Sequence, residues 1–240
     1  PTEKTFLLKP LGIEQLVLVP FDKTLASKSA ETFVNEILIK TLKAKHIAIG
    51  ENFKFGRNRE GDIYTLKRIG ASLGIKVSII PILEDDQGRL SSSRIRKALR
   101  VGDLNRANSL LNRAYTFRGI VEKGKGLGKK MGWPTANLRI DGRKLLPSLG
   151  VYAAWASIQN KNERFYAVMN IGPQPTIDPK LPSAVEVHLL DKELSLLGEE
   201  LIIEPVERLR TQIKFKNLED LRKQINLDAL LAKEILKKNH

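Results

Sequence analysis

A glycine- and lysine-rich segment, GKGLGKKMGWPTAN, fills residues 124–137 of the chain. Glycines let a backbone approach a phosphate closely and turn N–H groups toward it, and lysines add positive charge. The segment matches neither a Walker A loop, which needs Ser or Thr after its lysine, nor the G-x-G-x-x-G of a Rossmann loop. It predicts a phosphate-binding loop of another type, with a flexible basic hairpin turn as the alternative. Its glycines are Gly124, Gly126, Gly128 and Gly132.

Thr135 and Asn137 end this segment two positions apart. Side chains two positions apart on a β-strand point to the same face, so the hydroxyl and amide oxygens are expected side by side. Hard oxygen ligands of this kind suit Mg²⁺. The pair therefore predicts a magnesium site next to the glycine-rich segment.

A carboxylate stands in the strand-like stretch EVHLLD, residues 186–191. Alternation on a strand places Glu186, His188 and Leu190 on one face. A carboxylate near a bound nucleotide can accept a proton from an attacking hydroxyl. The alternative for Glu186 is an edge-strand position facing water, and His188 is more often structural than catalytic.

Two stretches in the first half have features of anion or ligand binding. In LSSSRIRKAL (90–99), serines precede a helix that carries arginines, and helix N-termini bind anions. Ser92, Ser93 and Arg96 are the candidates, with an ordinary serine cap as the alternative. In GENFKFGRNREGD (50–62), Asn52 follows a predicted strand and is a candidate ligand contact, with a surface loop as the alternative.

The elements that position these residues change character near residue 113. Before it, strands predicted at 15–19, 46–50 and 76–82 alternate with helices at 31–43, 62–73, 94–100 and 103–111, which predicts a parallel α/β sheet. After it, short β segments separated by Gly, Pro and Asn predict an antiparallel barrel or sandwich. These segments are 117–123, 135–140, 151–158, 164–171, 184–190 and 200–208. A final amphipathic helix is predicted at about 217–236, capped by Asn217.

The charge and cysteine content of the chain limit the kinds of ligand and cellular location to be expected. The 240 residues carry a net charge of +14, which favours an anionic partner such as a nucleotide, a nucleic acid or a membrane surface. The chain has no cysteine, which excludes disulfides and predicts a reducing, cytoplasmic location. It has no apolar run long enough for a membrane span. Because the chain starts at Pro1 rather than Met, we expect residues upstream.

Taken together, these stretches resemble the prokaryotic bifunctional riboflavin kinase and FMN adenylyltransferase (FAD synthetase) family. GENFKFG resembles the adenylyltransferase loop, and SSSRIR its Ser-Ser-Thr-x-Ile-Arg phosphate motif. GKGLGKKMGWPTAN is similar to the kinase signature, with Trp133 in place of the usual Phe. GVYAA (150–154), NIGPQPT (170–176) and EVHLLD follow in the family's order. The resemblance covers essentially the whole chain.

The resemblance implies an α/β nucleotidyltransferase (Rossmann-like) domain with a parallel sheet at 1–112. It implies a six-stranded antiparallel β-barrel kinase domain with a C-terminal helix at 113–240. Two departures stand out: the sequence has no His-x-Gly-His motif, and DKELSLLG (191–198) differs from the family's turn ending Leu-Tyr-Gly. The resemblance starts partway into the first domain. A kinase with an inactive first domain therefore remains an alternative, and a non-catalytic RNA-binding barrel protein is a distant one.

The resemblance also implies roles for the candidate residues. ATP, a co-substrate, would lie over the four glycines, Thr135 and Asn137 would hold Mg²⁺, and Glu186 would act as the base toward riboflavin. Arg210 would contact the flavin. Asn52, Ser92, Ser93 and Arg96 would bind ATP and FMN in the adenylyltransferase. The expected partners are riboflavin, FMN, FAD, ATP and ADP, with no nucleic acid and no membrane, and the oligomeric state stays open.

Overall fold

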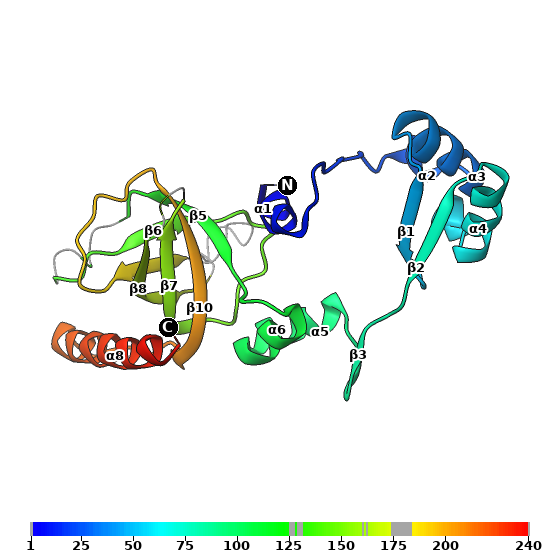
Figure 1. Cartoon of the computed structure of the whole chain (residues 1–240). Coiled ribbons are helices and arrows are strands. Elements are labelled where there is room, and N and C mark those ends of the chain that lie inside the picture. The colour runs from blue at the N-terminus through cyan, green and yellow to red at the C-terminus, as the bar shows by residue number, and fades with distance from the viewer. Residues whose placement is uncertain are drawn as a thin grey trace. The chain divides into compact units, whose positions relative to one another are not determined.

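The computed structural model of the chain describes residues 2–124, 128, 132–159, 161, 163–173 and 184–239. The chain divides into two compact units, Pro1–Leu90 and Ser91–His240, and each is described by itself (Figure 1). The first contains a parallel strand pair with helices, and the second a closed barrel with helices.

The first unit is built around two parallel strands, β1 (His46–Gly50) and β2 (Lys76–Ile80), which pair from His46 opposite Lys76 to Gly50 opposite Ile80. The parallel pairing and the helix between the strands confirm the predicted α/β pattern. The other elements are α1 (Thr2–Leu8), η1 (Lys9–Leu11), α2 (Lys23–Ala26), α3 (Ala30–Thr32), η2 (Phe33–Thr41), η3 (Arg57–Arg59), α4 (Ile63–Ser72), β3 (Glu84–Asp85) and β4 (Gly88–Arg89).

Helix α4 shows how the sequence sets an element boundary in this unit. Asp62 lies in extended conformation before the helix, and its carboxylate accepts hydrogen bonds from the backbone N–H groups of Tyr64 and Thr65. The bond from the Thr65 backbone, together with those from Lys54 and the Thr65 hydroxyl, lowers the pKa of Asp62 to about 2. Leu66 and Ile69 of the helix are buried with Val34 in the unit's apolar core.

The strand predicted at 15–19 is wrong. Residues 13–22 have no regular secondary structure, and Val17 and Leu18 are 54% and 60% exposed. A strand needs a neighbour for its backbone groups, and among the described residues β1 and β2 form a sheet of only two strands, paired with each other. An apolar run alone therefore does not settle whether a strand forms.

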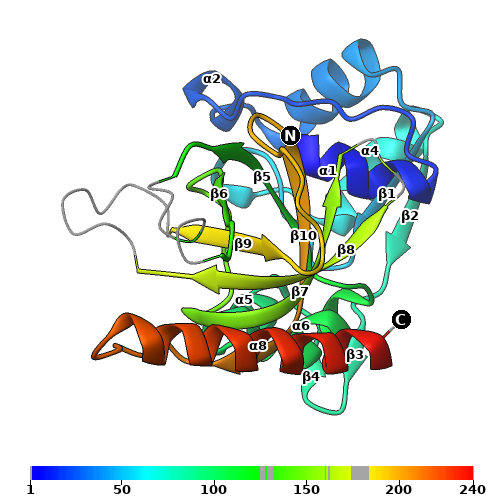
Figure 2. The same cartoon turned by 90° about the vertical axis from the view of Figure 1, so that its left-hand side faces the viewer.

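The second unit is a closed antiparallel barrel with the strand order β10-β5-β6-β9-β8-β7 (Figure 2). The six strands confirm the predicted barrel and overlap the predicted segments. They are β5 (Phe117–Glu122), β6 (Ala136–Arg139), β7 (Gly150–Ile158), β8 (Arg164–Ile171), β9 (Val185–Leu189) and β10 (Glu200–Arg210). Because β10 pairs with both β5 and β7, the sheet has no free edge.

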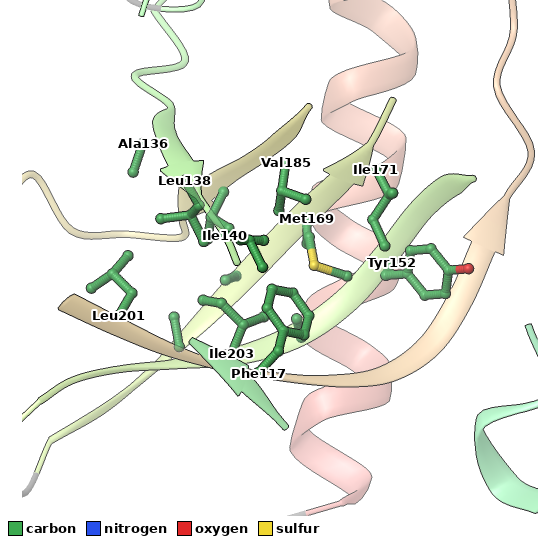
Figure 3. Packing of buried hydrophobic residues seen from close by; sticks show 14 of the residues in the cluster. Phe117, Ala136, Leu138, Ile140, Tyr152, Met169, Ile171, Val185, Leu201 and Ile203 are labelled. Atoms are coloured by element: carbon green, nitrogen blue, oxygen red, sulfur yellow. The ribbon is translucent and has the colours of Figure 1, made fainter. Parts of the chain in front are cut away.

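Alternating apolar side chains fill the barrel (Figure 3). In β9, Val185, Val187 and Leu189 are buried in this core, whereas Glu186 and His188 between them are only partly buried. The same alternation in β6 and β8 directs Asn137 and Asn170 away from the core. The apolar period thus fixes which polar side chains reach the outer side of the barrel.

Two helices, α5 (Ser92–Val101) and α6 (Leu104–Leu111), pack with the barrel. Ala98, Leu99, Leu104 and Ala107 belong to the same buried cluster as the barrel interior. The compact units therefore divide after Leu90, ahead of these helices. The division of the functional modules that we expect, between residues 112 and 113, lies after them and stays a prediction.

Helix α8 (Leu218–Lys238) lies along the outside of the barrel, against β7, β8 and β10 (Figure 2). The side chain of Asn217 accepts the N–H of Asp220 at 2.8 Å, which confirms the predicted cap. Ala229, Ala232 and Leu236 pack with Ala153 and Trp155 of β7 in a second apolar cluster.

A buried ion pair fastens α8 to β10. Asp228 is 4% exposed, and its carboxylate accepts three hydrogen bonds of 2.7–3.0 Å from the guanidinium of Arg210. Gln224 donates a further bond to Asp228 at 2.9 Å. The side chain of Arg210 is itself only 17% exposed, so each charge depends on the other for compensation.

We predict that Asp228→Ala lowers the free energy of unfolding of the second unit by about 3–5 kcal/mol, because it leaves the Arg210 guanidinium buried without its carboxylate. Both tryptophans, Trp133 and Trp155, lie in this unit, so their fluorescence during urea unfolding measures it selectively. The double variant D228A/R210A should lose less stability than D228A. A D228A variant as stable as the native chain would contradict the prediction.

Candidate active site

Four polar side chains lie at matching positions on adjacent strands of the barrel. Glu122 of β5 is opposite Asn137 of β6, Asn137 is opposite Glu186 of β9, and Glu186 is opposite Asn170 of β8. Directly opposed residues have Cβ atoms about 4.5–5.5 Å apart, within reach of each other's side chains. We call these four residues the polar row. It brings together Asn137 and Glu186, which the sequence predicted separately.

Glu186 lies in the row between two amide side chains. Asn137 and Asn170 flank it, and all three are partly buried. The ion pairs found within the described residues do not involve Glu186. A carboxylate in this position, without an ion pair among the described residues, is able to accept a proton.

The glycines at 124 and 128 approach the predicted magnesium ligands closely. A Cβ atom on Gly124 would overlap the side-chain amide of Asn137. A Cβ atom on Gly128 would overlap the carbonyl oxygen of Trp133 and lie 3.1 Å from Oγ1 of Thr135. Glycine is therefore required at these two positions because a side chain would collide with the protein's own site residues. Gly132 has a φ of +82°, which also favours glycine, and Gly126 lies outside the described residues.

His188 holds the segment that leads into β6. Its Nδ1 is 2.7 Å from the carbonyl oxygen of Pro134, and its ring packs edge-on against Trp133 with centroids 4.8 Å apart. These contacts fix the backbone just before Thr135. They agree with the expectation that His188 is structural.

A cleft of about 630 Å³ opens next to the polar row. Thr135 and Glu122 line it, and Val187 and Leu189 contribute apolar surface. The rest of its wall includes the segment 192–197, where Lys192 supplies a cation. Since Glu122 belongs to both, the polar row runs from the margin of the cleft across the outside of β6, β9 and β8.

The far end of the row is tied to the segment that follows β10. The amide of Gln212 donates to Oδ1 of Asn170 at 2.6 Å and to the carbonyl oxygen of Ile171 at 3.0 Å. Arg210, two residues earlier, is engaged with Asp228 and lies over the ring of Phe215 at 5.8 Å. In the structure the guanidinium of Arg210 is held in an ion pair with Asp228. Its predicted contact with the flavin stays a prediction.

A sequence model of riboflavin kinase (Flavokinase) matches residues 111–236, and one of FAD synthetase matches residues 1–94. The bifunctional riboflavin kinase/FMN adenylyltransferase of Haemophilus influenzae is 35% identical over 231 residues, covering 96% of this chain and 74% of the relative. The chain belongs to the bifunctional riboflavin kinase/FMN adenylyltransferase family. The Escherichia coli K12 relative of the same name is 34% identical over 97% of this chain and 73% of its own length.

A solved structure supports the same relationship. The crystal structure of a macrolide-efflux protein from Streptococcus pneumoniae has a TM-score of 0.86 and 31% identity, covering 97% of this chain and 74% of that chain. The name of that protein refers to macrolide efflux; its likeness to this chain is in fold and sequence. No helix among the described residues is long and apolar enough to cross a membrane.

In this bifunctional family member, the FAD synthetase match includes Asn52 of the first unit and Ser92 and Ser93 of the second. With its amide oxygen turned toward Arg89, Asn52 accepts two hydrogen bonds of 3.0 and 2.6 Å from that guanidinium. The cap of α5 is Ser91, so Ser92 and Ser93 occupy the first helical positions and are exposed. Arg96 donates to Oγ of Ser93 at 3.0 Å.

Sequence reasoning missed several side chains of the kinase half. Glu122, Asn170 and Gln212 were not singled out, although strand alternation over 164–171 places Asn170 on the outer side. Gln212 follows the end of β10 and carries no periodic signal. The part of NIGPQPT from residue 174 onward lies outside the described residues.

We predict that Gly124→Ala displaces the side chain of Asn137, because the added methyl group overlaps its amide. The side-chain amide signals of Asn137 in ¹H–¹⁵N NMR spectra should shift or broaden, and stability should fall by about 1–3 kcal/mol, as for other overpacking changes. Gly172→Ala is the matched control, since a Cβ there meets nothing closer than 3.6 Å. Unchanged Asn137 signals in G124A would refute this view of Gly124.

Proposed function

We propose that the second unit transfers the terminal phosphoryl group of ATP to the ribityl hydroxyl of riboflavin, with Glu186 as the general base. A bond forms between the ribityl oxygen and the γ-phosphorus, and the bond from that phosphorus to the β–γ bridging oxygen breaks, releasing ADP. The hydroxyl proton passes to the carboxylate of Glu186. The observation that carries the proposal is the placement of Glu186 between two amides, in a polar row whose Glu122 lines the cleft.

Asn137 of the polar row and Thr135, two residues before it, fit Mg²⁺. Thr135 offers a hydroxyl and Asn137 an amide oxygen, and Mg²⁺ in phosphoryl-transfer sites commonly takes one or two protein oxygens together with phosphate oxygens and water. Thr135 also lines the cleft in which phosphates would lie. When bound, the ion would neutralise charge on the transferring phosphoryl group. Gly124 and Gly128 would act by letting these two side chains keep their positions.

The expected effect of Glu186→Ala is a fall in kcat for FMN formation of about 10²–10⁴-fold, the usual contribution of a general base. The KM for ATP should change little, because no phosphate contact is assigned to Glu186. Glu207→Ala is the control, since Glu207 is an exposed carboxylate on β10 away from the row. Separation of flavins after incubation with riboflavin, ATP and Mg²⁺ measures both variants. Near-native turnover by E186A would overturn the assignment.

For the FAD synthetase half, we infer that an oxygen of the FMN phosphate attacks the α-phosphorus of ATP. The bond from that phosphorus to the α–β bridging oxygen breaks and pyrophosphate leaves. Asn52 would contact ligand, and Ser92, Ser93 and Arg96 would hold phosphate at the start of α5. The support is the family match over 1–94 and the exposure of the Ser93–Arg96 pair at a helix N-terminus. The expected cytoplasmic location stays a prediction.

A variant of Arg96 separates the two activities. Arg96→Ala should reduce FAD formation by at least about tenfold, the loss of one charge-assisted phosphate contact, and leave FMN formation unchanged. Arg100→Ala is the control, since Arg100 is exposed and lies at the other end of α5, next to its last residue. Equal loss of FMN and FAD by R96A would argue against two separate sites. FMN accumulating without FAD in the native chain would favour the alternative in which only the kinase half is active.

A further inference from the structure

Helix α8 exposes leucines on the side that faces away from the barrel. Leu227, Leu230 and Leu231 are 59%, 61% and 44% exposed, whereas the helix buries Ala229 and Ala232 against the barrel. Spacings of three and four residues place the three leucines on one face of the helix. We call them the leucine stripe. A contiguous exposed apolar surface of this kind marks an interaction site.

Charged side chains extend the stripe in both directions at the same spacing. Asp220 and Lys223 precede it, and Glu234 and Lys238 follow it, all four exposed. Steps of three and four residues are the pattern of a helix–helix seam. Lys223 pairs with Glu219 at 2.8 Å, and Asp220 takes part in the cap. An exposed pair such as Lys223–Glu219 is weak enough to exchange partners on association.

The order of charges along this face is complementary to itself when the helix is reversed. Lys223 and Glu234 are equally far from the point between Asp228 and Ala229, and Asp220 and Lys238 are so to within one residue. Reversal also places Leu227 opposite Leu230, with Leu231 next to it. In an antiparallel pair of α8 helices, these acids therefore lie opposite or beside these bases, and leucine faces leucine. A parallel pair would set each charge against its own copy, which is repulsive.

We propose that the leucine stripe is a homodimer interface, in which α8 of a second copy packs antiparallel about a two-fold axis at Asp228–Ala229. Two-fold contacts use the same patch on both subunits, and this patch meets that requirement in both its apolar and its charged positions. One helix face buries less than the roughly 800 Å² per partner of a standard interface. We therefore expect a weak dimer, with a dissociation constant of about 10 µM to 1 mM.

Sedimentation equilibrium of the full chain over a range of concentrations tests the proposal. The native chain should show a monomer–dimer equilibrium in that range. Leu230→Glu should weaken the dimer by more than about tenfold, because it places two carboxylates in the apolar centre of the seam. Leu218→Glu is the matched control, since Leu218 is 71% exposed on the same helix but off the stripe, and it should leave the dimer unchanged.

Charge reversal tests the antiparallel register. K223E places a carboxylate opposite Glu234 of the second copy and should weaken the dimer by at least about threefold, as E234K should by setting two lysines opposite each other. The double variant K223E/E234K restores opposite charges and should recover the native dissociation constant. Circular dichroism and thermal midpoints close to native in each variant show that folding is intact, because all the altered residues are exposed.

A monomer at every concentration overturns the proposal. So does a dimer that L230E leaves intact, or one in which K223E/E234K is no tighter than the two single variants. A lower thermal midpoint in L230E with no change in mass would mean that the stripe is covered within one chain, and this also overturns it.

Discussion

The register of β9 between β6 and β8 is the constraint on which the kinase site depends. Val187 opposite Ala136 and Val185 opposite Leu138 set Glu186 opposite Asn137, and the same register sets Glu186 opposite Asn170. A slip of one residue would send Glu186 into the apolar interior and Val187 to the outer side. The buried valines of β9 therefore decide the position of the carboxylate as firmly as any contact it makes. Closure of the barrel through β10 removes the free edges at which such slips begin.

The barrel also supports the polar row from its far end, through a chain of contacts that starts on α8. Asp228 fixes Arg210 at the end of β10. The segment that follows β10 then lies against Asn170. Gln212 then binds both the side chain of Asn170 and the backbone of Ile171. Asn170 in turn lies opposite Glu186. A buried ion pair is weak evidence for stability by itself, but here it also fixes the segment that orients a site residue.

Much of this arrangement was open to prediction from the sequence, because alternation in the barrel strands reports directly which side chains face outward. Asn137 and Glu186 were identified as candidates in this way. Their placement opposite each other was not predictable from the residues alone, since register depends on pairs distant in sequence. The apolar run at 15–19 failed because strand formation needs a partner that periodicity does not show. Gln212 and Asp228 act through single tertiary contacts and leave no local pattern.

The glycine-rich motif was identified correctly from the sequence, but the reason given for its glycines was incomplete. Their spacing predicted close approach to a phosphate, while the structure shows the backbone at 124 and 128 pressed against Asn137 and the Trp133–Thr135 segment. Asn137, Trp133 and Thr135 already fill the space that a Cβ atom at 124 or 128 would occupy. The backbone at these two positions is therefore packed against the site before a ligand binds. Gly124 and Gly128 are therefore structurally coupled to Asn137 and Thr135. A change in either glycine acts on these side chains before any phosphate is bound.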